Sequence, residues 1–231
     1  MLVCFWSPKG GSGTSVFAAA AALVLAREAP ARVADLAGDL PAVFGLAQDP
    51  DPGLRDWLRI GPEAPTDALD RFAVEAAPGL SILGAGAGSL AGAPPEAGAA
   101  LAVALGADPR PTIADAGVVS PHPDALHAFV DVADASVIVV RGCYLALRRA
   151  VAIELTTHAT GVVFVDEPGR SLGPRDVASV LGVPVLATVA LKAATARAVD
   201  AGVLATRLPD SLARPAREVL RRIGGIREEA A

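Results

Sequence analysis

The sequence predicts an α/β fold, a doubly wound and mainly parallel sheet of about seven strands with helices on both faces. Short apolar runs rich in Val, Leu and Ile alternate along the chain with segments of helical length and composition. This alternation is typical of parallel sheets, in which each crossover connection contains a helix. A glycine-rich turn also joins the first run to the first helical segment. We therefore predict one domain over residues 1–231.

The elements follow in order from these patterns. The predicted strands cover residues 2–6, 32–36, 80–83, 112–115, 136–140, 161–165 and 184–189. The predicted helices cover residues 15–28, 123–132, 144–157, 174–181 and 193–201.

Three other segments have their own signals. Leu54, Trp57 and Leu58 have the spacing of one helical face, which predicts a further helix. Gly, Ala and Pro crowd residues 84–98, which we interpret as a flexible surface loop before a helix. We expect residues 211–231 to form a C-terminal helix and tail.

Composition excludes several classes of function. The net charge of −5 argues against a strongly basic nucleic-acid binder, so DNA binding is not expected. The two cysteines form no CxxC pair and lie in apolar stretches, as buried thiols of a reducing compartment do. The three histidines lack the spacing of a metal site. No apolar stretch has the length of a signal peptide or a membrane span, and we expect a cytoplasmic protein.

The glycine-rich turn, Ser7-Pro8-Lys9-Gly10-Gly11-Ser12-Gly13-Thr14-Ser15, directly follows the first predicted strand and opens an Ala-rich helix. Glycines let the backbone turn tightly so that N–H groups point inward, and the positive end of the helix favours an anion. This context predicts a phosphate-binding loop. The alternative is a turn that merely joins strand to helix.

The turn resembles the deviant Walker A motif, KGGxGK[ST], of the ParA/MinD superfamily of ATPases. The resemblance implies that residues Gly10, Gly11, Ser12, Gly13, Thr14 and Ser15 form the binding site for ATP or ADP, and that Ser15 also ligates magnesium. It also implies that Lys9 acts catalytically by reaching the nucleotide of a partner subunit in a homodimer.

Thr14 departs from that motif, because it stands where the family has the lysine of the phosphate loop. That ammonium normally neutralises the charge that grows on the phosphates as the bond breaks. Its loss costs roughly two to three orders of magnitude in rate. We expect hydrolysis to be weak or absent, and the retention of nucleotide stays open.

Carboxylates complete the predicted site. Asp35 ends the second predicted strand and matches the first aspartate of the family's D-x-D pair, which implies catalytic and metal-binding roles. Ala37 occupies the second position, and Asp39 can substitute only if the loop bends back. Asp115, at the end of the strand over residues 112–115, resembles the Walker B aspartate that binds magnesium through water. The alternatives are a helix cap at Asp35 and a turn initiator at Asp115.

The predicted base-binding residues also depart from the family. Asp166 stands where relatives place an asparagine that reads adenine, and a carboxylate can accept but not donate a hydrogen bond. Ala190, Leu191 and Lys192 occupy the segment in which relatives usually have a proline.

The resemblance implies a positioning protein that localises a partner protein complex. Residues 38–46 and 78–83 look most like the CpaE/TadZ branch, which acts in Tad-pilus localisation. Two other hypotheses stay open: a nucleotide-free scaffold and a DNA-riding partition ATPase. The C-terminal helix is loosely similar to the basic amphipathic helix with which MinD relatives contact membranes, and its alternative is packing on the sheet.

Overall fold

The computed structural model describes residues 1–61, 63–87 and 93–225, and its centre is one eight-stranded sheet. The strand order is β3-β4-β2-β5-β1-β6-β7-β8, and every neighbouring pair is parallel except β3 and β4. The strands are β1 (Leu2–Ser7), β2 (Ala31–Asp35), β3 (Ala73–Ala77), β4 (Leu80–Leu83), β5 (Thr112–Val118), β6 (Ala135–Arg141), β7 (Gly161–Asp166) and β8 (Val185–Ala190).

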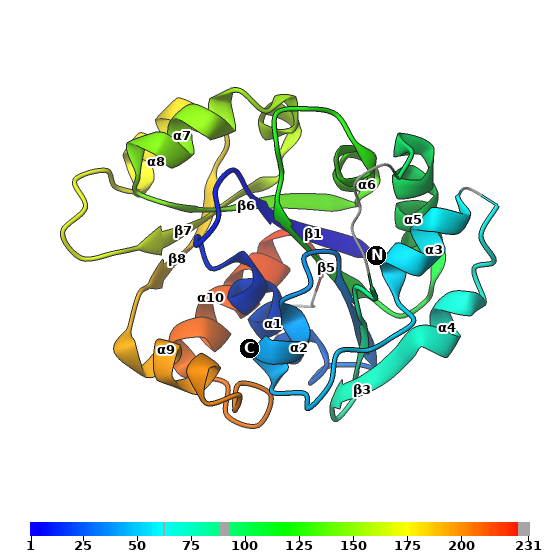
Figure 1. Ribbon diagram of the computed structural model, residues 1–231. Coiled ribbons are helices and arrows are strands. Elements are labelled where there is room, and N and C mark those ends of the chain that lie inside the picture. The colour runs from blue at the N-terminus through cyan, green and yellow to red at the C-terminus, as the bar shows by residue number, and fades with distance from the viewer. Residues whose placement is uncertain (62, 88–92, 226–231) are drawn as a thin grey trace.

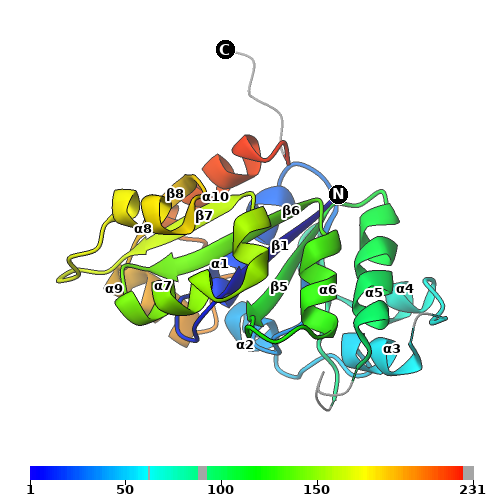
Figure 2. The ribbon, with the colours of Figure 1, turned by 90° about the horizontal axis from the view of Figure 1, so that it is seen from above.

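Helices cover both faces of the sheet, as Figures 1 and 2 show. One face carries α1 (Thr14–Leu25), α2 (Leu40–Phe44), α9 (Ala193–Asp200) and α10 (Asp210–Arg222). The other face carries α3 (Leu54–Ile60), α4 (Ala68–Phe72), α5 (Pro95–Ala107), α6 (Ala125–Val132), α7 (Tyr144–Val151) and α8 (Pro174–Leu181).

The central strand β1 shows how the sheet divides the core in two. Its six residues are all buried, and successive side chains point to opposite faces of the sheet. Val3 and Phe5 pack with α1 and α10, whereas Cys4 and Trp6 pack with the helices of the second face. Runs that are apolar on both sides are expected of strands covered on both faces. The predicted doubly wound α/β fold is confirmed.

Several element boundaries differ from the sequence prediction. The antiparallel strand β3 was not predicted. The loop predicted over residues 84–98 ends before α5, which begins at Pro95, because Pro fits the first turn of a helix; residues 88–92 of that loop lie outside the described residues. The helix predicted over residues 144–157 divides into α7 and a 3₁₀ helix, Glu154–His158.

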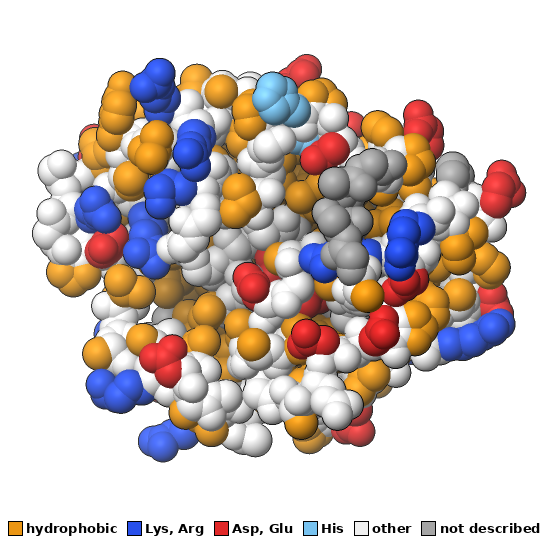
Figure 3. Space-filling model, viewed as in Figure 1, with side chains coloured by type: hydrophobic (Ala, Val, Ile, Leu, Met, Phe, Trp, Pro, Cys, Tyr) orange, Lys and Arg blue, Asp and Glu red, His pale blue; other side chains and the backbone are white. Residues whose placement is uncertain are grey.

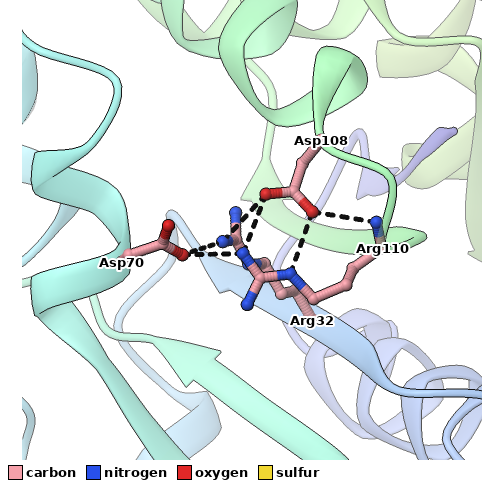
Figure 4. A network of polar contacts seen from close by, with 4 residues as sticks. All are labelled: Arg32, Asp70, Asp108 and Arg110. Carbon is pink, nitrogen blue, oxygen red and sulfur yellow. Dashed lines mark hydrogen bonds and ion pairs between the residues drawn. The ribbon is translucent and has the colours of Figure 1, made fainter.

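A polar network joins three of these elements at the amino-terminal end of β2 (Figure 4). The Arg32 side chain is only 2% exposed and pairs with Asp108 at 2.9 Å and with Asp70. Arg110 contacts the same two carboxylates, Asp70 at 2.7 Å and Asp108 at 2.8 Å. The network therefore ties α4 and the end of α5 to the central sheet.

Candidate functional site

The glycine-rich turn, residues 8–13, leads from the carboxyl end of β1 into the first turn of α1. Gly11 and Gly13 have φ angles of 77° and 89°, which side-chain-bearing residues rarely adopt. The Ser12 hydroxyl donates a hydrogen bond of 2.7 Å to the Lys9 carbonyl. The Ser7 hydroxyl lies 3.1 Å from the same carbonyl and 3.2 Å from the Gly117 carbonyl. These bonds hold the turn in an open loop beside β5.

Most backbone N–H groups of the loop are not used by the protein itself. Within the described ranges, none of the N–H groups of residues 10, 11 and 13–16 donates a hydrogen bond to a protein acceptor, whereas the Ser12 N–H closes the turn at Gly10 and Gly11. The loop borders a cavity of about 560 Å³, a size typical of small-molecule sites. Consecutive amides facing an open cavity at a helix N-terminus are the arrangement that binds phosphate.

The side chains of the loop take different positions. Thr14 and Ser15 line the cavity, and the Thr14 side chain is buried. The Lys9 ammonium lies 3.3 Å from the Gly10 carbonyl, and Lys9 is not among the residues that line the cavity. Lys9, the positively charged residue of the loop, therefore does not place its charge in this cavity.

Asp115 and Asp35 are neighbours in the sheet, one on β5 and one on β2, and both are buried. Both oxygens of Asp35 accept backbone N–H groups, from Gly38 at 2.6 Å and Leu40 at 3.2 Å. One oxygen of Asp115 accepts the Gly117 N–H at 3.0 Å. Its other oxygen, Oδ2, is buried and has no hydrogen-bond partner in the described part of the chain.

Burial makes both carboxyl groups hard to ionise. Loss of solvent raises the pKa of Asp35 to about 6, although the Gly38 and Leu40 amides act against the rise. Loss of solvent also raises the pKa of Asp115 to about 7. The Ser15 hydroxyl lowers that pKa, and the negative charge of Asp35 raises it. A cation near Asp115 would favour its ionised form.

Asp39 reaches the site because the loop after β2 bends back. It lines the cavity, and its carboxylate accepts a hydrogen bond of 3.4 Å from the Ser15 hydroxyl. The bend that Asp39 requires to reach the glycine-rich turn is thus present. Asp35 forms the bend, because its two hydrogen bonds hold the backbone of residues 38 and 40.

These groups fit a magnesium ion held mainly by water and phosphate. No cluster of three or more metal-ligating side chains exists among the residues described. Magnesium, however, is usually held by one or two protein oxygens, several waters and substrate phosphates. Three oxygen ligands for a metal lie beside the glycine-rich turn: the Ser15 hydroxyl, the Asp39 carboxylate and the oxygen of Asp115 that has no hydrogen bond within the described chain. They fit the metal of a magnesium–nucleotide complex.

Known structures share this fold over nearly the whole chain. A ParA family ATPase from Chlorobium tepidum matches with a TM-score of 0.77 and 18% identity, covering 94% of this chain and 97% of its own. The chain has the ParA/MinD fold. MinD from Pyrococcus horikoshii, complexed with Mg-ADP, matches with a TM-score of 0.76 and 17% identity, covering 96% of both chains.

A third ParA/MinD structure is the MinC:MinD cell division complex of Aquifex aeolicus. It matches with a TM-score of 0.75 and 16% identity, covering 100% of this chain and 98% of that chain. No protein-family model matches the sequence, and no curated protein matches it.

A smaller cavity of about 200 Å³ adjoins the larger one at Ser12 and Gly13. Its walls are mainly apolar and include Val165 of β7, Val189 of β8 and Leu191 after β8. Asp166 is exposed and lines neither cavity. The structure therefore does not bring Asp166 to the predicted base site, because its side chain follows Val165 and points the other way in the strand.

Several residues that line the two cavities were not predicted from the sequence. They are Ala42 and Val43 of α2, Arg141 of β6, and Val199 and Asp200 of α9. Arg141 could have been predicted, because it ends a strand parallel to β1 and therefore lies at the same end of the sheet as the glycine-rich turn. The helix residues lie far from the glycine-rich turn in sequence and carry no motif.

The α2 and α9 walls of the larger cavity touch at two glycines. Gly45 follows α2 and has a φ angle of 75°, and a Cβ atom there would overlap the Gly202 carbonyl oxygen. A Cβ at Gly202 would in turn lie 3.1 Å from the Gly45 Cα. The two backbones therefore meet directly, with no side chain between them.

The C-terminal helix α10 packs against α1 and the sheet. Leu212, Ala216, Val219 and Leu220 of α10 are buried in the core shared with α1 and β8. This is the second of the two interpretations of that helix; residues 226–231 of the predicted tail lie outside the described residues. None of the helices in the described part is long and apolar enough to cross a bilayer.

Proposed function

We propose that this protein is a ParA/MinD-type positioning protein that binds ATP or ADP with magnesium and localises a partner protein complex. The observation that carries the proposal is the loop itself. Six of its N–H groups, at residues 10, 11 and 13–16, lack acceptors in the described structure and border a cavity of about 560 Å³. Such amides favour an anion of the size and charge of a polyphosphate.

The side chains around the loop have distinct proposed roles. Ser15 would ligate magnesium, Asp115 would hold its water shell, and Asp39 would stand where a water-positioning carboxylate is needed. Asp35 would act indirectly, by holding the bend that presents Asp39. Lys9 would serve the nucleotide of a partner subunit in a face-to-face homodimer. The MinD structure complexed with Mg-ADP supports the nucleotide, and the MinC:MinD complex supports a protein partner.

We propose that hydrolysis is slow or absent. A magnesium–nucleotide complex supplies a leaving phosphate whose growing charge must be neutralised. At the motif's lysine position the chain offers only the neutral hydroxyl of Thr14, so that neutralisation is missing there. Nucleotide binding would then act as a slow switch of dimerisation rather than as a fast cycle.

The first prediction restores the missing charge. Thr14→Lys should tighten Mg·ATP binding about tenfold or more, because a charge-assisted hydrogen bond contributes about 1.5–3 kcal/mol. It should also raise phosphate release above the wild-type rate. Isothermal calorimetry and a phosphate-release assay measure the two quantities. Thr66→Lys adds the same charge at an exposed position away from the cavity and should change neither.

The nucleotide-free scaffold is the second candidate function. Thr14, Ala37, Asp166 and Ala190 together favour it, since each departs from the family's pattern. A thermal-shift titration of the wild-type protein with Mg·ATP separates the two, because a ligand that binds only the folded state must raise the melting temperature. If Mg·ATP raises the melting temperature of neither the wild-type protein nor Thr14→Lys, the scaffold is favoured.

The pathway, the CpaE/TadZ branch and cytoplasmic localisation are predictions from the sequence. A peripheral membrane contact through α10 would need groups other than its buried apolar residues. Genes for pilus secretion or chromosome partition beside this one would identify the pathway. Retention on DNA that falls steeply with salt would instead indicate a partition ATPase.

A further inference from the structure

A third cavity lies away from the glycine-rich loop, between α9, the turn after it and the start of α10. Its volume is about 510 Å³. Val203, Leu208 and Pro209 give it apolar walls, and Arg197 and Arg207 give it two positive charges. Figure 3 shows Lys and Arg side chains over α9 at the lower left, apart from the basic group over α7 and α8. We name it the arginine cavity.

The two arginines are not neutralised by the protein. Neither Arg197 nor Arg207 forms an ion pair within the described residues, and both are exposed. The one acidic residue in the lining, Asp210, lies 3.8 Å from Arg214, which is outside the cavity. The arginine cavity therefore has a net positive charge in a protein whose total charge is −5.

Backbone hydrogen bonds fix the wall that carries Arg207. The Gly202 N–H bonds to the Val199 carbonyl at 2.9 Å, and the Val203 N–H bonds to the Ala198 carbonyl at 3.0 Å. The Arg207 N–H then bonds to the Val203 carbonyl at 2.8 Å. This chain of bonds continues α9 into the turn, so the backbone positions of both arginines are set before any ligand arrives.

We propose that the arginine cavity binds an acidic protein segment, with its carboxylates on Arg197 and Arg207 and an apolar side chain between Val203 and Leu208. Guanidinium groups match carboxylates in geometry and charge, and the apolar walls suit a neighbouring aliphatic side chain. Nucleic acid is less suitable, because its phosphates need a basic surface larger than two arginines. The inference goes beyond the proposed function, because it depends on this cavity alone and needs no nucleotide.

The test uses the full-length protein and a fluorescein-labelled peptide, Glu-Leu-Asp-Leu-Glu, followed by fluorescence anisotropy. The peptide should bind saturably, and the affinity should fall as salt is raised. The double substitution Arg197→Gln and Arg207→Gln should weaken binding about tenfold or more, because two charge-assisted contacts are lost. The amide peptide Gln-Leu-Asn-Leu-Gln should not bind.

The matched control is the double substitution Arg175→Gln and Arg221→Gln. It removes the same charge from exposed positions on α8 and α10, outside the cavity, and should leave the affinity within about twofold. In a ¹H–¹³C NMR spectrum the Val203 methyl signals should shift on addition of the acidic peptide. This readout places the peptide in the cavity even if a variant loses stability.

Several outcomes would overturn the proposal. They are an acidic peptide that does not bind, equal losses in the two double variants, and Val203 signals that do not move. A DNA duplex that binds through the same arginines while the peptide does not would make the cavity a nucleic-acid site instead. If free succinate displaces the peptide and binds as tightly as the peptide does, the arginine cavity is a small-molecule site instead. Failure of Mg·ATP to bind would affect only the proposed function.

Discussion

At the scale of single residues, the carboxyl group of Asp115 is the clearest example of a group whose surroundings oppose its charge. It is buried, one of its oxygens has no hydrogen-bond partner in the described chain, and Asp35 lies beside it on β2. With a pKa of about 7 the group is only partly ionised at neutral pH, and a nearby cation would favour its ionised form. Stability and cation binding at this position should therefore both depend on pH.

The stability prediction follows from the direction of the shift. Because the pKa of Asp115 is raised to about 7, the folded state holds a proton that the unfolded state releases above about pH 4. The free energy of unfolding should thus fall as pH rises from 4 through 7. Asp115→Asn should remove part of this fall, making the variant about 1–3 kcal/mol more stable than wild type at pH 8 but not at pH 4.

Urea denaturation at pH 4 and pH 8 measures this difference. Asp131→Asn makes the same change at an exposed position on α6 and should behave as wild type at both pH values. A difference between Asp115→Asn and wild type that is equal at the two pH values would contradict the prediction.

Residues tied to a motif were the ones that the sequence could place. The glycine-rich turn and Ser15 lie where their spacing puts them, and Asp115 is close by because parallel strands end at a common edge. Asp39 depended on a bend whose cause, the two hydrogen bonds to Asp35, has no sequence signature. Asp166 and the cavity residues of α9 depend on side-chain direction and on tertiary packing, which local patterns do not encode.

At the scale of elements, Arg32 links the central strand β2 to α4 and to the end of α5 (Figure 4). Because its guanidinium is buried, removing one of the two carboxylates that neutralise it should cost more stability than removing a carboxylate from an exposed ion pair. Asp108 is the better shielded partner, with 15% of its side chain exposed against 59% for Asp70.

Asp108→Ala should therefore destabilise the protein by about 2–4 kcal/mol, because it leaves a buried charge with one exposed partner. Asp67→Ala is the matched control. It breaks an ion pair with Arg71 in which both side chains are largely exposed, and it should cost no more than about 0.5 kcal/mol. The free energy of unfolding in urea measures both. Equal losses of unfolding free energy in the two variants would show that Asp108 is not required to stabilise the buried Arg32.

The elements that the sequence predicted are those with strong periodicity. All seven predicted strands exist, with ends that differ by three residues or fewer. The missed strand β3 contains Ala and Glu in four of its five positions and lies at the sheet edge, where burial imposes little pattern. The early part of α5 has no clear helical signal in the sequence, because its Pro, Gly and Ala residues suit a turn as well as a closely packed helix.

At the scale of the whole molecule, the contact between Gly45 and Gly202 joins the amino-terminal and carboxy-terminal parts of the chain across the larger cavity. Gly45→Ala should cost about 2–4 kcal/mol, the sum of a left-handed backbone strain and an overlap with the Gly202 carbonyl. Gly169→Ala is the matched control, because Gly169 has a φ angle of 85° but open space around it, and it should cost about 1 kcal/mol.

Thermal and urea unfolding measure the stability of both glycine variants. Equal losses of unfolding free energy would mean that the backbone at Gly202 moves away from the new Cβ at little energetic cost. Gly45 and Gly202 therefore set the minimum separation of the turns that follow α2 and α9, and any larger residue at either position can only push those turns apart.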